Sequence, residues 1–274
     1  MKFNQKEYLI NIANETIDII NRGFYINKNR TKVQVGELVS ASVNGTELIK
    51  EYACTSANKD GKGIDNIAVI SGSTIDTIID LRKQGIEGNI VALNFASAKH
   101  AGGGFLRGTI AQEESIARTS ALYPSLMSKK EFYDYNVNLN TPLYSDLMIY
   151  SPEVPIFRDD KFNLLLNPVT SSIITSPAVN AGIARERGIK ENVIRDTMAE
   201  RIDKIVDFAV SKEPEVILLG AYGCGVFKND ITMVANLFKQ SLSKIKTDKD
   251  IKVIFAIYDK DGKMVDIFNK ILCK

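Results

Sequence analysis

The sequence contains few of the residues that mark metal-binding or disulfide-rich proteins. Its 274 residues include three cysteines, one histidine and no tryptophan. Cys54, Cys224 and Cys273 fall in no metal-ligand spacing, and a lone His100 does not complete a zinc site, so we expect no metal. Scattered thiols of this kind are typical of a reducing compartment, and the sequence therefore predicts a cytoplasmic protein.

Long apolar stretches and a charge imbalance are also missing. No uninterrupted apolar run approaches the ~18 residues that a membrane span requires, and the N-terminus carries no apolar signal core. Lys and Arg number 35 against 33 Asp and Glu. This near balance disfavours broad or sequence-specific nucleic-acid binding, but it leaves room for one basic pocket that holds a small anion. We therefore expect neither a membrane nor a nucleic acid as a partner.

What the sequence does contain indicates an α/β protein. Hydrophobic residues make up 45% and charged residues 25%, as in ordinary globular proteins. Helices are expected over residues 5–21, 73–83, 112–123, 192–209, 230–242 and 263–272, and strands over residues 67–70, 90–95, 172–175, 216–219 and 253–257. One or two short strands are expected within residues 31–43. This alternation predicts a layered fold with a parallel or mixed sheet, and the charged turn at residues 59–63 is the expected domain boundary.

The first chemically informative loop follows the strand at residues 90–95. Three successive glycines at residues 102–104 let a ligand approach the backbone closely. Gln112, Glu113 and Glu114 then open a helix, where acidic side chains are often only partners of the helix dipole. Adjacent helical residues point about 100° apart, however, so the two carboxylates have different tasks. One can face the hydroxyls of a ligand while the other reaches the reacting bond, as glycoside cleavage needs.

The second informative loop follows the strand at residues 216–219. Gly223, Cys224, Gly225 and Val226 precede Phe227 and a helix N-terminus. Consecutive backbone N–H groups in such a loop form a concave anion site that suits a diphosphate, and the phenylalanine offers a flat surface to a base or ribose. A plain turn with a core phenylalanine is the alternative. No Gly-Lys-Ser/Thr follows, which disfavours nucleoside triphosphate hydrolysis.

The two loops together resemble the signature of poly(ADP-ribose) glycohydrolases of the bacterial type. Gly102-Gly103-Gly104, a short spacer and Gln112-Glu113-Glu114 carry the resemblance. The other matching segments are residues 93–97, 104–106, 118–126, 150–152, 157–160, 175–177 and 223–227. The match spans roughly residue 67 to the C-terminus, and it is specific because distant segments agree in order.

The resemblance implies a macrodomain, a three-layer α/β/α sandwich with a mixed sheet, over residues 64–274. Residues 1–63 are then a helical and β extension packed on it. It also implies a glycosidase-type hydrolase that cleaves the ribose–ribose O-glycosidic bonds of poly(ADP-ribose) and releases ADP-ribose, without a cofactor. The implied partners are the polymer or ADP-ribosylated macromolecules, and cutting from the chain end is expected.

Residue by residue, the resemblance assigns the catalytic acid to Glu114 and the substrate-orienting place to Glu113. The implied substrate-binding positions are Asn94, Gly103, Gly104, Gln112, Gly223, Cys224, Gly225, Val226 and Phe227. One departure is His100-Ala101, where bacterial members tend to carry Asn-Pro. It affects the expected contacts to the distal ribose and leaves the acid unchanged.

Three alternative functions stay open. The chain could be a macrodomain that binds ADP-ribose without cleaving it, a hydrolase of single ADP-ribose units on proteins or of related esters, or an interaction protein acting through its N-terminal extension. An intact Gln112-Glu113-Glu114 favours an enzyme over a reader. His100 as a catalytic base and Cys224 as a nucleophile are less favoured hypotheses.

Overall fold

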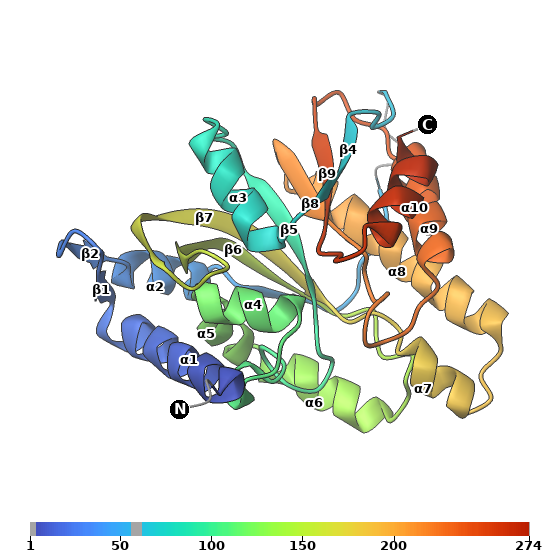
Figure 1. The fold of residues 1–274 in the computed structure, drawn as a ribbon. Helices are drawn as coiled ribbons and strands as arrows, with labels where there is room; N and C mark the ends of the chain where they lie inside the picture. The colour runs from blue at the N-terminus through green and yellow to red at the C-terminus, as the bar shows by residue number, and fades with distance from the viewer. Residues whose placement is uncertain (1–3, 56–61, 274) are drawn as a thin grey trace.

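A computed structural model of the chain describes residues 4–55 and 62–273. Over these ranges the chain forms a seven-stranded sheet with helices on both faces, and a small two-stranded sheet near the N-terminus (Figure 1). The strands are β1 (Phe24–Ile26), β2 (Lys32–Gln34), β3 (Glu47–Ile49), β4 (Ile67–Ser71), β5 (Ile90–Phe95), β6 (Met148–Arg158), β7 (Leu164–Ser176), β8 (Val216–Leu219) and β9 (Lys252–Ile257).

The helices alternate with these strands along most of the chain. They are α1 (Gln5–Arg22), α2 (Gly36–Asn44), α3 (Thr74–Lys83), the 3-10 helix η2 (Phe105–Arg107), α4 (Gln112–Thr119), α5 (Leu122–Met127), α6 (Lys130–Leu139), α7 (Ala181–Glu186), α8 (Glu191–Ser211), α9 (Ile231–Lys244) and α10 (Lys263–Leu272). No helix in the described ranges has the length and apolar character needed to cross a membrane.

The large sheet is mixed, with the strand order β3-β6-β7-β5-β8-β9-β4. β7, β5, β8, β9 and β4 run parallel, whereas β6 is antiparallel to both of its neighbours. The central strand β5 is buried on both faces, because Ile90 and Ala92 pack into one hydrophobic cluster and Val91 and Leu93 into another. Helices α3 to α6 supply the first cluster, and helices α8 to α10 supply the second, which gives the predicted three layers (Figure 1).

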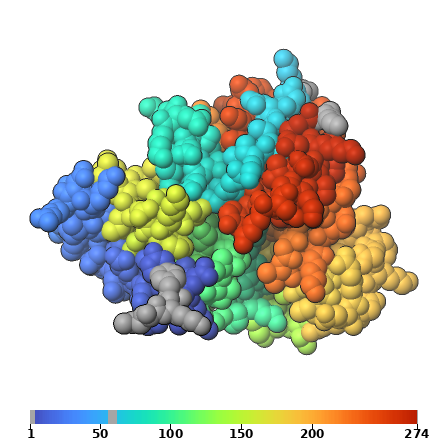
Figure 2. All heavy atoms as spheres, in the orientation of Figure 1, coloured from blue at the N-terminus to red at the C-terminus, as the bar shows by residue number. Residues whose placement is uncertain are grey.

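The N-terminal residues are joined to the rest of the molecule by a strand pairing and by side-chain contacts. β3 pairs antiparallel with β6 and so adds an edge strand to the large sheet. The hydroxyl of Thr16 on α1 donates a hydrogen bond of 2.6 Å to the carbonyl of Arg118 on α4. In the space-filling view, the blue N-terminal residues lie against the yellow and green segments of the middle of the chain (Figure 2). The boundary expected at residues 59–63 falls mostly outside the described residues.

Most predicted elements are confirmed, but two predictions were wrong. Only β2 occupies part of residues 31–43, and the rest forms α2. Val35, Val39 and Ser42 are buried at helical spacing there, and this periodicity overrides the strand preference of valine. The helix predicted over residues 112–123 ends at Thr119. Pro124 has no N–H for the carbonyl four residues earlier, and its ring crowds that carbonyl, so the chain breaks and restarts as α5.

Candidate active site

The carboxylates of Glu113 and Glu114 lie in the first turn of α4, against the glycine loop that follows β5. Both residues are buried, with exposed fractions of 3% and 6%. Gly103 has a φ of +59°, and a Cβ at this position would lie 2.4 Å from Oε1 of Glu114 and 3.0 Å from Oε2 of Glu113. Only glycine therefore allows the loop to pass this close to both carboxylates.

The environment of Glu113 favours its protonated form. Its Oε2 accepts a hydrogen bond of 2.7 Å from the N–H of Ser97, and its Oε1 accepts one of 3.4 Å from Nδ2 of Asn94. Burial raises the pKa of Glu113 to about 8, although these hydrogen bonds oppose the shift, and the charge of Glu114 adds to it. Glu113 is therefore neutral at pH 7.

Glu114 is held by the main chain and lies beside a buried cation. Its Oε1 accepts a hydrogen bond of 2.9 Å from the N–H of Gly104. One turn later, the buried guanidinium of Arg118 donates to the carbonyls of Glu114 and Phe105 at 3.3 Å each, and also to the carbonyl of Thr109. Arg118 thus ties α4 to the turn that follows the glycine loop, which fixes the Glu114 carboxylate relative to that loop.

Gln112 contacts the protein with both ends of its side-chain amide. Its Oε1 accepts from the N–H of Phe95 at 2.8 Å, and its Nε2 donates to the carbonyl of Leu93 at 2.8 Å and to Oγ1 of Thr74 at 3.1 Å. These contacts fasten α4 to the end of β5. Substrate binding by Gln112 stays a prediction, and a positioning role explains the contacts that the structure shows.

Asn94 is the penultimate residue of β5, and its side chain contacts the carboxyl group of Glu113. Its side chain is fully buried, and besides Glu113 its Nδ2 donates a hydrogen bond of 3.2 Å to Oγ1 of Thr175. The Oδ1 atom of Asn94 has no hydrogen-bond partner among the described residues. The amide is therefore oriented toward Glu113, and its contact with a substrate stays a prediction.

The second predicted loop follows β8, the neighbour of β5 in the sheet, so the two loops meet at one edge. Gly223 has a φ of +72°, and a Cβ there would lie 2.5 Å from Cβ of Ala178 and 2.6 Å from Nδ2 of Asn229. Asn229 closes the base of the loop through hydrogen bonds of 2.8 Å to the carbonyl of Val179 and 3.0 Å to that of Gly223.

The tip of the same loop is open. No atom lies within 4 Å of a Cβ placed on Gly225, and Val226 is 80% exposed. Phe227 is half-buried, and its ring lies 6.0 Å from that of Tyr144. Its carbonyl accepts a hydrogen bond of 3.0 Å from Gly182, so the N-terminal end of α7 braces the loop. The base of the loop is therefore held in place by hydrogen bonds, and its tip at Gly225 and Val226 is accessible to an anion.

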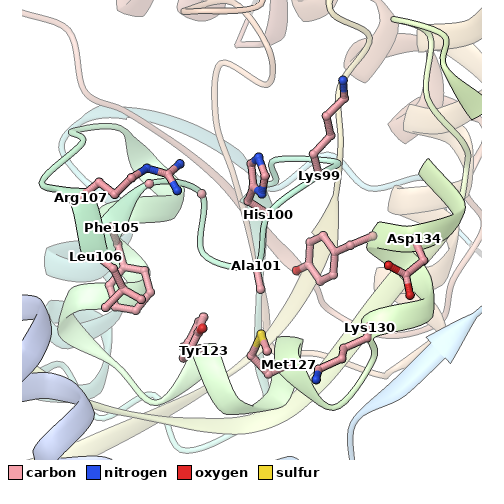
Figure 3. A pocket seen from close by; sticks show the side chains of 13 residues that line it. Lys99, His100, Ala101, Phe105, Leu106, Arg107, Tyr123, Met127, Lys130 and Asp134 are labelled. Atoms are coloured by element: carbon pink, nitrogen blue, oxygen red, sulfur yellow. The ribbon is translucent and has the colours of Figure 1, made fainter. Parts of the chain in front are cut away.

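The structure supports neither of the two less favoured catalytic hypotheses. Burial raises the pKa of Cys224 to about 12, so it is a thiol rather than a nucleophilic thiolate at neutral pH. His100 is exposed, and its backbone N–H donates to Oγ of Ser97 at 3.2 Å. The side chain of His100 lines a cavity beside the glycine loop (Figure 3).

Sequence reasoning missed three residues that hold the site together, namely Ser97, Arg118 and Asn229. Ser97 and Arg118 belong to the matching segments, but their partners are main-chain atoms or a neighbouring carboxylate, which a linear pattern does not reveal. Within the described ranges, no group of three or more His, Cys, Asp or Glu side chains is placed to hold a metal ion.

Comparisons with known proteins agree on one family. The family model for the microbial-type PARG catalytic domain, where PARG is poly(ADP-ribose) glycohydrolase, matches residues 13–159. The crystal structure of poly(ADP-ribose) glycohydrolase from Thermomonospora curvata is 32% identical, with a TM-score of 0.86, and the match covers 96% of this chain and 99% of that chain.

Complexes of bacterial relatives match as well. The Thermomonospora curvata enzyme bound to the inhibitor ADP-HPD is 34% identical over 96% of this chain and 99% of that chain, with a TM-score of 0.85. The Deinococcus radiodurans enzyme in complex with ADP-ribose is 34% identical over 85% of this chain and 96% of that chain, with a TM-score of 0.74. None of the curated proteins searched matches the chain. The family model spans more than half of the sequence and the structural likeness nearly all of it, so the chain belongs to the microbial-type poly(ADP-ribose) glycohydrolase family.

Proposed function

We propose that this chain hydrolyses the ribose–ribose O-glycosidic bonds of poly(ADP-ribose) and releases ADP-ribose, with Glu114 as general acid and then general base. The observation that carries the proposal is the buried Glu114 carboxylate, held at 2.9 Å by the Gly104 N–H in a member of this family. Relatives solved with ADP-ribose and with ADP-HPD support ADP-ribose as the ligand.

The reaction takes two proton transfers through one carboxyl group. In the first step, protonated Glu114 gives its proton to the departing ribose oxygen while the bond from that oxygen to the anomeric carbon breaks. The resulting oxocarbenium-like sugar then meets a water molecule. Glu114, now a carboxylate, takes a proton from this water as the water oxygen bonds to the anomeric carbon. One water is consumed, and Glu114 regains its proton.

Glu113 takes the orienting place in this scheme. The raised pKa of about 8 makes its carboxyl neutral at pH 7, so it adds no like charge when Glu114 becomes a carboxylate after the first step. A neutral carboxyl both donates and accepts hydrogen bonds, which suits a ribose with vicinal hydroxyl groups. Hydrogen bonds from Ser97 and Asn94 hold the group in one orientation.

ADP-ribose lies across the edge where the two loops meet. The diphosphate occupies the loop at residues 223–227, whose base Asn229 fixes, and a ribose lies beside the half-buried ring of Phe227. The open rim at Gly225 and Val226 leaves room for this anion. The resulting assignment is a macrodomain over residues 64–274, with residues 1–63 as an extension that contributes the edge strand β3.

The partners and the compartment follow from the same assignment. The substrate is the polymer or an ADP-ribosylated macromolecule, so the chain reverses ADP-ribosylation. Cys54, Cys224 and Cys273 are all free thiols, which suits a reducing, cytoplasmic location. Fractionation of the cell followed by detection of the native chain tests this location, and recovery from an oxidising compartment would contradict it.

The decisive experiment is Glu114→Gln, which keeps the shape of the side chain and removes the proton that is donated. We expect this variant to bind ADP-ribose within a few-fold of wild type, while cleavage falls by at least the ~10²–10⁴ typical of lost acid–base catalysis. Glu113→Gln should slow cleavage with a larger share of the effect on KM. The assay measures ADP-ribose release from purified polymer, with calorimetric binding on the same preparations.

Glu186→Gln serves as the matched control, because Glu186 is an exposed glutamate on α7. It should change neither binding nor cleavage. Near-wild-type cleavage by folded Glu114→Gln would refute the assignment of the acid. Binding of ADP-ribose without cleavage by the wild-type chain would instead indicate a reader, and activity only on single protein-linked units would indicate a mono-ADP-ribosyl hydrolase.

A further inference from the structure

A cavity of about 320 Å³ opens beside the glycine loop, on the side that faces α5 and α6 (Figure 3). This volume is at the lower end of the ~300–1,000 Å³ that small-molecule sites occupy. Gly103 and Gly104 line the cavity, and the same two residues contact the catalytic carboxylates. The cavity is therefore bounded by the same loop that holds the Glu114 carboxylate, and none of the roles proposed above uses it.

The cavity contains a buried hydroxyl that has no partner. Tyr133 on α6 lines it and is only 7% exposed, and its Oη has no hydrogen-bond partner among the described residues. Buried polar groups in native proteins are nearly always satisfied, so such a hydroxyl points to a ligand atom that completes it. The partly exposed ring of Tyr123, whose centroid lies 5.0 Å from that of the buried Phe105 ring, adds an apolar surface that suits a nucleobase.

The charged side chains around the cavity favour an anion. Lys99, Arg107 and Lys130 line it against one acidic side chain, Asp134. None of these four takes part in an ion pair within the described part of the chain. Figure 3 shows Arg107 and Lys130 on opposite sides of the cavity, whereas the side chain of Lys99 extends away from it. The cavity also lies at the N-terminal end of α6, where the helix dipole attracts negative charge.

The position of the cavity along α6 relates it to the proposed substrate. Lys130 and Tyr133 lie at the start of this helix, whereas Tyr144, which faces Phe227, follows its other end. A substrate that runs from Phe227 to Glu114 reaches the glycine loop, and Gly103 and Gly104 of this loop also line the cavity. The part of the polymer beyond the cleaved bond then lies beside the cavity.

We propose that this cavity holds the next ADP-ribose unit of the polymer, the one that carries the departing ribose oxygen. Its adenine and ribose lie against Tyr123, its diphosphate faces Arg107 and Lys130, and the hydroxyl of Tyr133 bonds to one of its oxygen atoms. This inference rests on the proposed function and adds a second subsite to it. The subsite gives the enzyme a preference for polymer over a single ADP-ribose with a small leaving group.

The test measures binding separately from cleavage. In the Glu114→Gln background, which removes turnover, calorimetry compares ADP-ribose with a dimer of two linked ADP-ribose units. We expect the dimer to bind at least tenfold more tightly. Tyr133→Phe, and separately the double variant Arg107→Gln with Lys130→Gln, should remove most of this advantage while changing the affinity for ADP-ribose less than twofold.

Matched controls exist for both kinds of variant. Tyr25 also has a buried hydroxyl without a partner among the described residues, but it lies in the N-terminal cluster, so Tyr25→Phe should leave the dimer advantage intact. Lys28→Gln with Arg30→Gln removes two exposed charges far from the cavity and should likewise have no effect.

Each result distinguishes this subsite from the proposed function. Equal affinity for monomer and dimer in the Glu114→Gln protein would overturn the subsite, even where wild type cleaves the polymer. A Tyr133→Phe variant that loses affinity for both ligands equally would also overturn it, because the hydroxyl would then act on the first unit or on folding. A chain that cleaves nothing but shows the dimer advantage would refute the glycohydrolase and keep the subsite.

Discussion

The backbone N–H of Gly104 donates a hydrogen bond of 2.9 Å to Oε1 of Glu114, so the glycine loop holds the proposed acid without using a side chain. The N–H of Ser97, in the same loop, holds Glu113 at 2.7 Å. Two carboxyl groups that are adjacent in sequence are thus fixed by two main-chain donors from one loop. The position of the Glu114 carboxyl group therefore depends on the backbone path of the glycine loop.

Gly103→Ala should abolish most of the cleavage in a protein that still folds. The new Cβ would lie 2.4 Å from Oε1 of Glu114, closer than real contacts allow, so either the loop or the carboxylate must move. A displacement of about 1 Å at a reacting group can cost on the order of 10²-fold in rate. Polymer cleavage and the melting temperature should be measured on the same preparation.

Gly85→Ala is the control that separates the clash with Glu114 from the strain of a left-handed backbone. Gly85 also has a positive φ, +91°, but no atom lies within 4 Å of a Cβ placed on it. Both variants should lose roughly 1–2 kcal/mol of stability from the left-handed backbone. Only Gly103→Ala should lose activity, and equal activity in the two folded variants would show that the carboxylate has room to adjust.

The raised pKa of Glu113 predicts a stability that falls with pH. Its pKa rises from 4.5 to about 8 on folding, so between these values the native state binds more protons than the unfolded state. The free energy of unfolding therefore decreases as the pH rises through this window. The stabilising contribution is complete below about pH 4.5 and is lost by about pH 8. Its size is on the order of a few kcal/mol.

Glu113→Gln removes this titration, so the comparison is the difference between wild type and variant. Urea unfolding at pH 5, 6.5 and 8.5 should show wild type losing stability relative to Glu113→Gln with each step. A difference that is constant across the three pH values would mean that Glu113 does not hold its proton into the neutral range.

The parts of the fold that could be predicted from the sequence are those with a simple burial pattern. β5 is apolar except at Asn94 because both of its faces are covered, and α8 has one apolar stripe. β6 could not be predicted, because Pro152 and Pro155 lie inside it and proline argues against a strand. The structure accommodates them at the edge of the parallel region, where the register shifts between Ser151 and Val154.

The candidate site was predictable only as far as its motifs extend. The order of the glycine loops and Gln112-Glu113-Glu114 carried the family resemblance, and the structure places Glu114 in the first turn of α4, against the loop that follows β5. The role of Arg118 could not be predicted, because its acceptors are carbonyls of residues 105, 109 and 114, and these converge only once η2 has folded back on α4. The cavity beside α6 could not be predicted either, because its lining residues come from separate segments that form no sequence motif.

Phe227→Ala should weaken the binding of ADP-ribose by roughly 1–3 kcal/mol if the ring stacks on the ligand, as base–aromatic stacking does elsewhere. The ring is half-buried and lies 6.0 Å from Tyr144, so the variant should also lose some stability. Calorimetry gives the affinity, and the melting temperature without ligand gives the stability. Unchanged affinity in a destabilised but folded protein would show that Phe227 is only a core residue.

Thr16→Val tests whether α1 supports the catalytic helix. The hydroxyl of Thr16 donates at 2.6 Å to the carbonyl of Arg118, which lies in the last turn of α4 and so has no partner within its own helix. Valine has nearly the same shape but leaves this buried carbonyl unsatisfied.

Thr197 supplies the matched comparison for that variant. Its hydroxyl donates at 2.8 Å to the carbonyl of Val193, but that residue is exposed in the first turn of α8, and its carbonyl keeps its helical hydrogen bond. We therefore expect Thr16→Val to lower the free energy of unfolding by about 1–3 kcal/mol, the cost of one buried unsatisfied group, and Thr197→Val to change it far less. Equal and small effects in urea unfolding would mean that α1 packs on α4 without supporting it, and the N-terminal residues would then be dispensable for the position of Glu114.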